Sequence, residues 1–165
     1  MHFPHLDERG HARMVDVTAK ATTGRRALAR GRVIMADSTA DGLAHATDLR
    51  ELVAEARTAA VFAAKATSDL LPLCHPIRLG DITVDFAIGE GVVEVTASVE
   101  ALDRTGVEME ALTACLVGAL TIYARCSTLD PTMSIEDVAV WEKAGGRSGH
   151  WRRREDGTVS HEPVE

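Results

Sequence analysis

The stretch LPLCHP, residues 71–76, places a titratable side chain on a constrained backbone. Histidine changes charge near neutral pH, and Pro76 would hold the turn rigid, so His75 could contact a ligand or donate a proton. A histidine in such a turn could also do no more than hydrogen-bond to the backbone. The residues alone leave both roles open, and the choice depends on what the rest of the chain brings near His75.

The stretch TGVEMEA places two carboxylates, Glu108 and Glu110, in the first turns of an expected helix. Acidic side chains are favourable near a helix N-terminus, and Thr105 with Glu108 has the spacing of a capping box. Residues two apart face different sides of a helix, so capping explains Glu110 less well. We therefore expect one carboxylate to point into a site or an interface, and Glu110 joins His75 as a candidate catalytic residue.

The stretch EKAGGRSG sets two glycines between Lys143 and Arg147. Backbone N–H groups in such a turn can wrap an anion, although the spacing matches neither a P-loop nor a dinucleotide fingerprint. A plain linker is the alternative. The basic segment 20–32 offers a second cationic element, which could instead be a solvated face.

The sequence contains no recognisable metal-binding motif and no recognisable catalytic nucleophile. Cys74 and His75 are adjacent, no second pair has ligand spacing, and no Ser, Cys or His belongs to a nucleophile–base motif. The three cysteines, Cys74, Cys115 and Cys126, lack CxxC spacing, which predicts reduced thiols.

Composition limits the class of protein. A chain of 165 residues with 45% hydrophobic residues fits one globular domain with a real core. Its net charge of −7 argues against nucleic-acid binding but permits a local basic cluster. We find no apolar run of roughly 20 residues and no signal peptide at the start, so we predict a cytoplasmic protein without membrane contact.

Hydrophobic periodicity predicts the elements that must position these side chains. Residues 11–18 could form an edge strand or an ordered arm. We expect a strand with a basic face in 20–35, a helix over 48–71, a hairpin of strands 81–88 and 91–102, a helix over 106–129 and a strand over 133–143. The hairpin implies an antiparallel sheet, and two long helices can cover one face of it. This order predicts an α+β fold of ferredoxin-like type in a single domain over 1–152, with a mobile tail over 153–165.

Several of these stretches together resemble one family. MVDVTAKA, AAKATSDLLPLCHP, TGVEMEALTA, LTIY and EKAGGRSG occur in order over about residues 5–152. They resemble the MoaC family, the cyclic pyranopterin monophosphate synthases of molybdenum cofactor biosynthesis. The resemblance implies a ferredoxin-like fold and a homohexamer, a trimer of dimers with active sites at subunit interfaces. It also implies conversion of 3′,8-cyclo-7,8-dihydroguanosine 5′-triphosphate, made by the partner enzyme MoaA, to cyclic pyranopterin monophosphate and diphosphate.

The resemblance also assigns residues to the site. It makes His75 and Glu110 catalytic and substrate-binding, and adds further substrate-binding positions: Leu73, Cys74, Met109, Lys20, Arg25, Lys65, Lys143 and Arg147. The cationic positions suit a triphosphate, which needs several donors and fixed charges. No protein-bound metal or other cofactor is expected, although Mg²⁺ could accompany the triphosphate.

Three positions depart from the family pattern. Where the family has a catalytic lysine, a catalytic aspartate and a second lysine, this chain has Leu49, Ala124 and Ser127. Losing one positioned acid or base typically costs ~10²–10⁴-fold in rate, so catalysis could be weak or absent. The chain could then be a pseudoenzyme that binds a nucleotide or assembles with an active paralogue, or a binding module for another phosphorylated ligand.

Helix geometry adds one expectation about assembly. Glu110 and Ala124 are 14 residues apart on one expected helix, or roughly 21 Å. The two positions of a single subunit cannot serve one small substrate atom, but two chains packed antiparallel could bring residue 110 of one chain beside residue 124 of the other.

Overall fold

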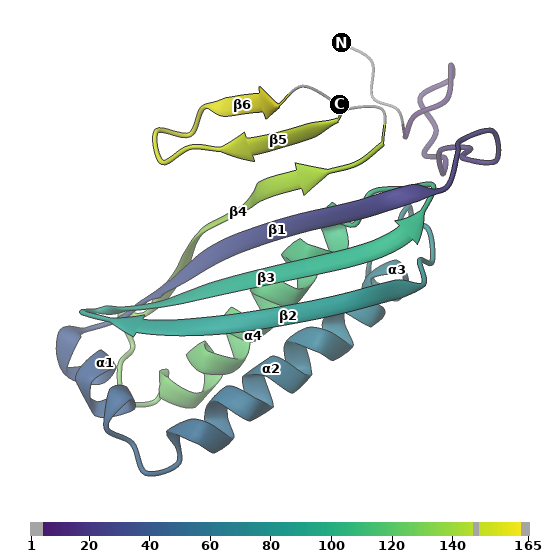
Figure 1. The fold of residues 1–165 in the computed structure, drawn as a ribbon. Coiled ribbons are helices and arrows are strands. Elements are labelled where there is room, and N and C mark those ends of the chain that lie inside the picture. The colour runs from purple at the N-terminus through teal and green to yellow at the C-terminus, as the bar shows by residue number, and fades with distance from the viewer. Residues whose placement is uncertain (1–4, 147–148, 163–165) are drawn as a thin grey trace.

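In the computed structural model, which describes residues 5–146 and 149–162, one antiparallel sheet carries two long helices on one face (Figure 1). The elements in chain order are β1 (Thr23–Ile34), α1 (Asp37–Ala44), α2 (Leu49–Lys65), α3 (Thr67–Leu70), β2 (Leu79–Gly89), β3 (Val92–Asp103), α4 (Glu108–Cys126), β4 (Ser134–Ala144), β5 (His150–Arg153) and β6 (Val159–Glu162).

The strand order is β2-β3-β1-β4-β5-β6, and every neighbouring pair is antiparallel. The first four of these strands, with α2 and α4, form the βαββαβ arrangement of a ferredoxin-like fold. The predicted α+β class and the sequence of strand, helix, hairpin, helix and strand are therefore confirmed.

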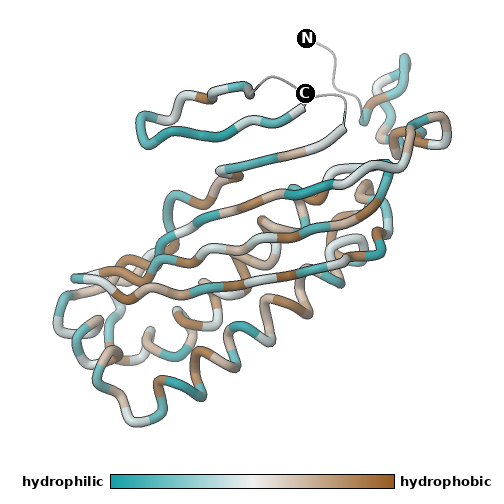
Figure 2. The backbone as a smooth tube through the Cα atoms, in the orientation of Figure 1, coloured by the Kyte–Doolittle hydropathy of each residue, from teal (hydrophilic) through white to brown (hydrophobic). Residues whose placement is uncertain are grey.

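β1 alternates between a core face and an outer face. Ala27, Ala29 and Val33 are fully buried beneath the helices, whereas Arg26 and Arg30 lie on the exposed side. Figure 2 shows the same alternation of hydrophobic and hydrophilic residues along the strands. Because strand side chains alternate between faces, Arg26, Arg30 and Arg32 lie on the face of the sheet that lacks helices, whereas Arg25 is buried.

α4 packs against both the sheet and α2. Its buried positions include Ala111, Ala114, Cys115 and Ile122, so small side chains allow the helix to approach the strands closely. By length and composition α4 is apolar enough to cross a membrane, which corrects the expectation that no segment comes near that limit. Its apolar character follows from burial in the core.

The structure differs from the sequence-based prediction in three places. The predicted helix over 48–71 is two helices, α2 and the short α3, and the segment 37–44 forms the unpredicted helix α1. For residues 11–18, the structure has the arm and not the strand of the two alternatives. The expected mobile tail instead contains β6, which pairs with β5 and extends the sheet beyond β4. The domain boundaries themselves stay a prediction.

Candidate functional site

A large cleft opens at the end of the sheet where β1 begins and β3 ends. It has a volume of about 1490 Å³. Its walls come from the irregular segment 15–23, the loop 73–77, the loop 104–106 with the first turn of α4, and the end of β4 with the start of β5. Segments far apart in the sequence therefore meet around one space.

Eight of the predicted site residues line this cleft: Lys20, Arg25, Leu73, Cys74, His75, Met109, Glu110 and Lys143. The structure does not bring Lys65 there, because it is the exposed last residue of α2. Arg147 lies outside the described residues.

Glu110 is the buried acid of the site, with a side chain that is only 4% exposed. Burial raises its pKa to about 7, and the nearby charges of Glu108 and Asp103 act in the same direction. A carboxylic acid with such a pKa is partly protonated near neutral pH and can both donate and accept a proton. The expectation that one of the two carboxylates faces a site holds for Glu110.

Cys74 lies near this acid in the turn that follows α3, and His75 is the next residue of the same turn and also lines the cleft. Burial raises the pKa of the Cys74 thiol, and the charge of Glu110 raises it further. The backbone N–H of Cys74 donates to the carbonyl of Leu71 at 2.9 Å, which closes the turn. His75 is close enough to Asp16 to help lower the pKa of that carboxyl, after the larger effect of hydrogen bonds from Thr18.

Glu108 does not cap α4 as predicted but forms an ion pair with Lys143 on β4. Its carboxylate forms an ion pair with the Lys143 ammonium group, and both side chains are about one-fifth exposed, at 21% and 20%. The residue before α4 is Val107, and no side chain caps that helix end. The capping box of Thr105 and Glu108 is therefore wrong, because the Glu108 carboxylate lies over Gly106 and reaches across to β4.

Arg25 is buried and holds the wall of the cleft together. Its Nε donates to the carbonyl of Asp103 at 3.0 Å, and its Nη2 donates to the carbonyl of Arg104 at 3.0 Å. Gly146 packs against the same guanidinium group, where a side chain at that position would collide. Arg25 thus has a structural contact in addition to its place in the cleft lining.

Sequence reasoning missed further cleft residues: Asp16, Arg104, Thr105 and His150. The hydroxyl of Thr105 is buried without a hydrogen-bond partner among the described residues, which is unusual for a buried polar atom. Thr105 stood in the quoted TGVEMEA stretch, so its position before α4 was an available signal. Asp16 likewise stood in the quoted MVDVTAKA stretch, whereas Arg104 and His150 lie in segments where periodicity predicted no element.

The three departures from the family pattern cluster at the opposite end of α4. Leu49 begins α2 and packs against the core, Ala124 is exposed on α4, and Ser127 follows that helix. An ion pair between Asp48 and Arg125 joins these two helix ends. None of the three replaced positions lines the cleft.

All three cysteines are free thiols, as predicted. Among residues 5–146 and 149–162, no three His, Cys, Asp or Glu side chains gather as ligands of a metal ion would.

Comparisons with known proteins agree with the motifs. A model of the MoaC family matches residues 14–146. Cyclic pyranopterin monophosphate synthase 3 of Mycobacterium tuberculosis H37Rv is 50% identical over 153 residues, covering 92% of this chain and 86% of that protein. The cyclic pyranopterin monophosphate synthase of Heliobacterium modesticaldum is 48% identical, covering 92% of this chain and 97% of that protein.

Among solved structures, a de novo designed protein with a ferredoxin fold is 15% identical, with a TM-score of 0.39 over 70% of this chain and 83% of the designed one. The fold assignment rests instead on the strand order described above. With a family match over most of its length and relatives near 50% identity, the chain belongs to the MoaC family.

Proposed function

We propose that this chain acts in molybdenum cofactor biosynthesis as a cyclic pyranopterin monophosphate synthase. The reaction converts 3′,8-cyclo-7,8-dihydroguanosine 5′-triphosphate to cyclic pyranopterin monophosphate and diphosphate. The proposal rests on one observation: Glu110, His75 and the cations Lys20 and Lys143 line the same cleft, in a chain of the MoaC family. Relatives at 48–50% identity carry the name of this activity.

The cleft offers the chemistry that such a substrate needs. Lys20 and Lys143 supply charge for phosphate oxygens, while Arg104 adds a planar donor group from the loop before α4. The pKa of Glu110, raised to about 7, suits a group that moves protons during ring rearrangement. His75 would act beside it. Mg²⁺ could enter with the triphosphate, and the substrate would come from MoaA in the cytoplasm.

The active assembly we propose is a homohexamer, a trimer of dimers with sites at subunit interfaces. An exposed apolar stripe along α4 supports it, formed by Met109, Leu116 and Leu120, which are 40%, 45% and 55% exposed. The stripe begins at the cleft and runs toward Ala124. Two chains packed antiparallel along it would bring the cleft end of one helix beside the 124 end of the other.

Catalysis in this assembly would be weak or absent, because Leu49, Ala124 and Ser127 supply neither charge nor a strong acid or base. The alternative function is therefore a catalytically impaired MoaC-like pseudoenzyme that binds the nucleotide or joins an active paralogue in a hetero-oligomer. Two relatives from Mycobacterium tuberculosis H37Rv are named synthase 2 and synthase 3, so numbered paralogues occur among the similar proteins.

Single-turnover conversion of the cyclic dihydroguanosine triphosphate tests the proposal. The purified chain is compared with a variant that carries Leu49→Lys, Ala124→Asp and Ser127→Lys. Product from the unmodified chain at a rate near that of the variant supports the synthase. Binding without turnover, together with turnover by the variant, supports the pseudoenzyme. Absence of both binding and turnover in the two proteins contradicts the proposed substrate.

A further inference from the structure

Residues 5–20 form an N-terminal arm that covers one side of the cleft. Figure 1 shows this arm as a loop outside the sheet, at the end where β1 begins and β3 ends. The cleft lining includes these residues of the arm: His5, Val15, Asp16, Val17, Ala19 and Lys20. The arm is therefore a wall of the cleft, although it belongs to no helix or strand.

The contacts of the arm hold it together as one unit. The Arg13 N–H donates to the His5 carbonyl at 2.9 Å, and the Asp7 N–H donates to the His11 carbonyl at 2.9 Å. The Asp7 carboxylate accepts from the N–H groups of Arg9 and His11. Within the part of the chain that the structure describes, every hydrogen bond and ion pair of the arm joins two of its own residues. The arm can therefore move without breaking any of these bonds.

Little apolar packing fastens the arm to the domain. No residue between 5 and 20 is buried, and Val15 and Val17, the valines of the cleft lining, are only half-buried. Arg25 on β1 is the first buried residue in the described part of the chain. Segments with few buried contacts open locally at a small cost in free energy. We therefore expect the arm to leave the cleft while the sheet and helices stay folded.

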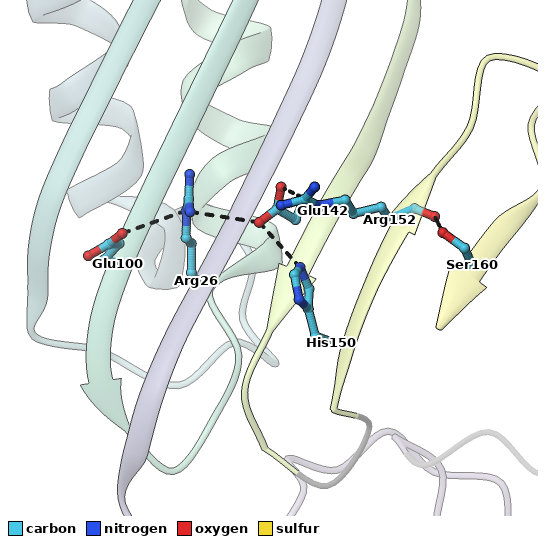
Figure 3. Close-up of polar contacts among 6 residues, drawn as sticks. All are labelled: Arg26, Glu100, Glu142, His150, Arg152 and Ser160. Carbon is cyan, nitrogen blue, oxygen red and sulfur yellow. Dashed lines mark hydrogen bonds and ion pairs between the residues drawn. The ribbon is translucent and has the colours of Figure 1, made fainter. Parts of the chain in front are cut away.

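The wall formed by β4 and β5 is fastened to the sheet. The Glu142 carboxylate on β4 lies 3.3 Å from the His150 Nε2 and 3.1 Å from the Arg152 Nε, both on β5. It also lies 3.7 Å from the Arg26 Nη1 on β1 (Figure 3). This network joins three strands on the face of the sheet that lacks helices, in addition to the backbone pairing of β4 with β5. A movement of the arm would therefore open the cleft while this wall stays in place.

An anion in the cleft can connect the arm to the fixed walls. Lys20 lies at the end of the arm, whereas Lys143 lies on β4, and both line the cleft. Phosphate oxygens that accept from both ammonium groups would tie the arm to the sheet by charge-assisted hydrogen bonds. Asp16 of the arm also lies close enough to His75 to interact with it electrostatically.

We propose that the N-terminal arm is a cover that opens and closes over the cleft as one unit, and that an anionic ligand bound to Lys20 and Lys143 holds it closed. The inference rests on the proposed function, because it takes the phosphate chain of a nucleoside triphosphate as the anion. Closure excludes water from the space beside Glu110 and strengthens the electrostatic interactions within it. Ligand binding and shielding of the site are then one event.

Limited proteolysis of the full chain with trypsin tests this cover. Trypsin cleaves after arginine, and Arg9 and Arg13 lie in the arm but outside the cleft lining, so a ligand in the cleft does not shield them by contact. Inorganic tripolyphosphate is the ligand, and calorimetry gives its dissociation constant. At about ten times this constant, cleavage after Arg9 and Arg13 should slow by up to about tenfold, because cleavage follows the population of the open arm. A small peptide substrate in the same reaction reports any direct effect on trypsin.

The control bond follows Arg154, an exposed residue between β5 and β6 that lies outside the cleft lining. Its cleavage should not change with tripolyphosphate. Lys143→Gln and Arg30→Gln are the matched variants, because Lys143 lines the cleft and Arg30 lies on the outer face of the sheet. Lys143→Gln should need roughly tenfold more tripolyphosphate for the same protection of the arm, and Arg30→Gln should need no more. Hydrogen exchange of the amides of residues 5–20 is a second readout that involves no protease.

Equal cleavage of the arm with and without tripolyphosphate overturns the inference, as does a failure of tripolyphosphate to bind. An arm that resists trypsin without ligand as fully as the bonds within α2 overturns it too, because such an arm does not open. Slower cleavage after Arg154 alone places the anion in the outer groove and has the same consequence. Each of these results leaves the proposed function standing, because turnover of the whole substrate decides it separately.

Discussion

At the scale of single residues, Glu110 combines deep burial with an acidic side chain at the wall of the cleft. Burial is the largest cause of its raised pKa, so the protein stabilises the protonated acid over the charged form. A buried acid of this kind lowers the free energy of unfolding at neutral pH, but it can transfer protons to and from a substrate. The first effect is measured as stability and the second as turnover.

Glu110→Gln should remove a pH dependence of stability. The pKa rises from 4.5 to about 7 on folding, so the folded chain binds more protons than the unfolded chain between these values. The contribution of Glu110 to the free energy of unfolding is therefore constant below about pH 4.5. It falls by up to about 3 kcal/mol as the pH rises from there to about 7 in the unmodified chain. Chemical denaturation of both proteins across this window checks the prediction, and parallel stability curves would contradict it.

Arg25→Lys should destabilise the protein more than Arg26→Lys, its neighbour on the exposed face of β1. The lysine cannot donate to the carbonyls of both Asp103 and Arg104, and an unsatisfied buried polar group costs about 1–3 kcal/mol. The free energy of unfolding measured in urea compares the two variants. Equal losses would mean that the Arg25 contacts do not stabilise the loop before α4.

At the scale of elements, α4 lies close to β1 because Gly31 has no side chain. A Cβ at this position would lie 2.9 Å from the Val138 Cγ2 and 3.1 Å from the Cys115 Sγ. To accommodate even one methyl group, the side chain of Val138 on β4 must move, and either Cys115 or α4 itself must shift away from β1.

Gly31→Ala should lower the free energy of unfolding by about 1–3 kcal/mol, the usual cost of overpacking a core. Gly24→Ala on the same strand is the control, because no atom lies within 4 Å of a Cβ placed there. Thermal unfolding of both variants provides the measurement. A Gly31 variant as stable as the Gly24 variant would contradict the prediction, because it would show that the neighbouring groups make room for a methyl group at little cost.

Elements with strong periodicity were predictable. The alternation of Ala27, Ala29 and Val33 with arginines identified β1, and the apolar composition of 106–129 identified α4. α1 and the β5–β6 hairpin were missed because they are short and polar. Pairing with β4 holds β5 in the sheet, and a local sequence window carries no signal for a tertiary contact of that kind.

The cleft residues also divide into those that the sequence predicted and those that only the fold brings together. His75, Glu110 and Lys143 belong to motifs that resemble a family, so the sequence identified them before any geometry was known. Arg104 and His150 join the cleft only because loops and an added strand close around it. Lys65 shares the motif of the cleft residues but lies at the exposed end of α2, so motif membership alone did not determine its position.

At the scale of the whole molecule, the proposed hexamer depends on the exposed stripe of α4. Leu120→Glu places a charge in the middle of this stripe and should break the assembly into smaller species, because a buried unpaired charge is strongly unfavourable. Light scattering coupled to size-exclusion chromatography measures the mass. Val159→Glu, an exposed apolar position on β6, is the control and should leave the mass unchanged. A hexamer that persists in Leu120→Glu would exclude α4 from the interface.

We propose that the cleft between β1, β4 and the start of α4 binds the triphosphate of the substrate. A second groove of about 510 Å³ on the outer face of the sheet, lined by Arg30, Arg152 and Trp141, is the competing basic site. The most direct measurement is therefore equilibrium binding of 3′,8-cyclo-7,8-dihydroguanosine 5′-triphosphate to the unmodified chain, to Lys143→Gln and to Arg30→Gln. We predict roughly tenfold weaker binding for Lys143→Gln and unchanged binding for Arg30→Gln. Weaker binding for Arg30→Gln, with Lys143→Gln unaffected, would show instead that the triphosphate binds in the outer groove.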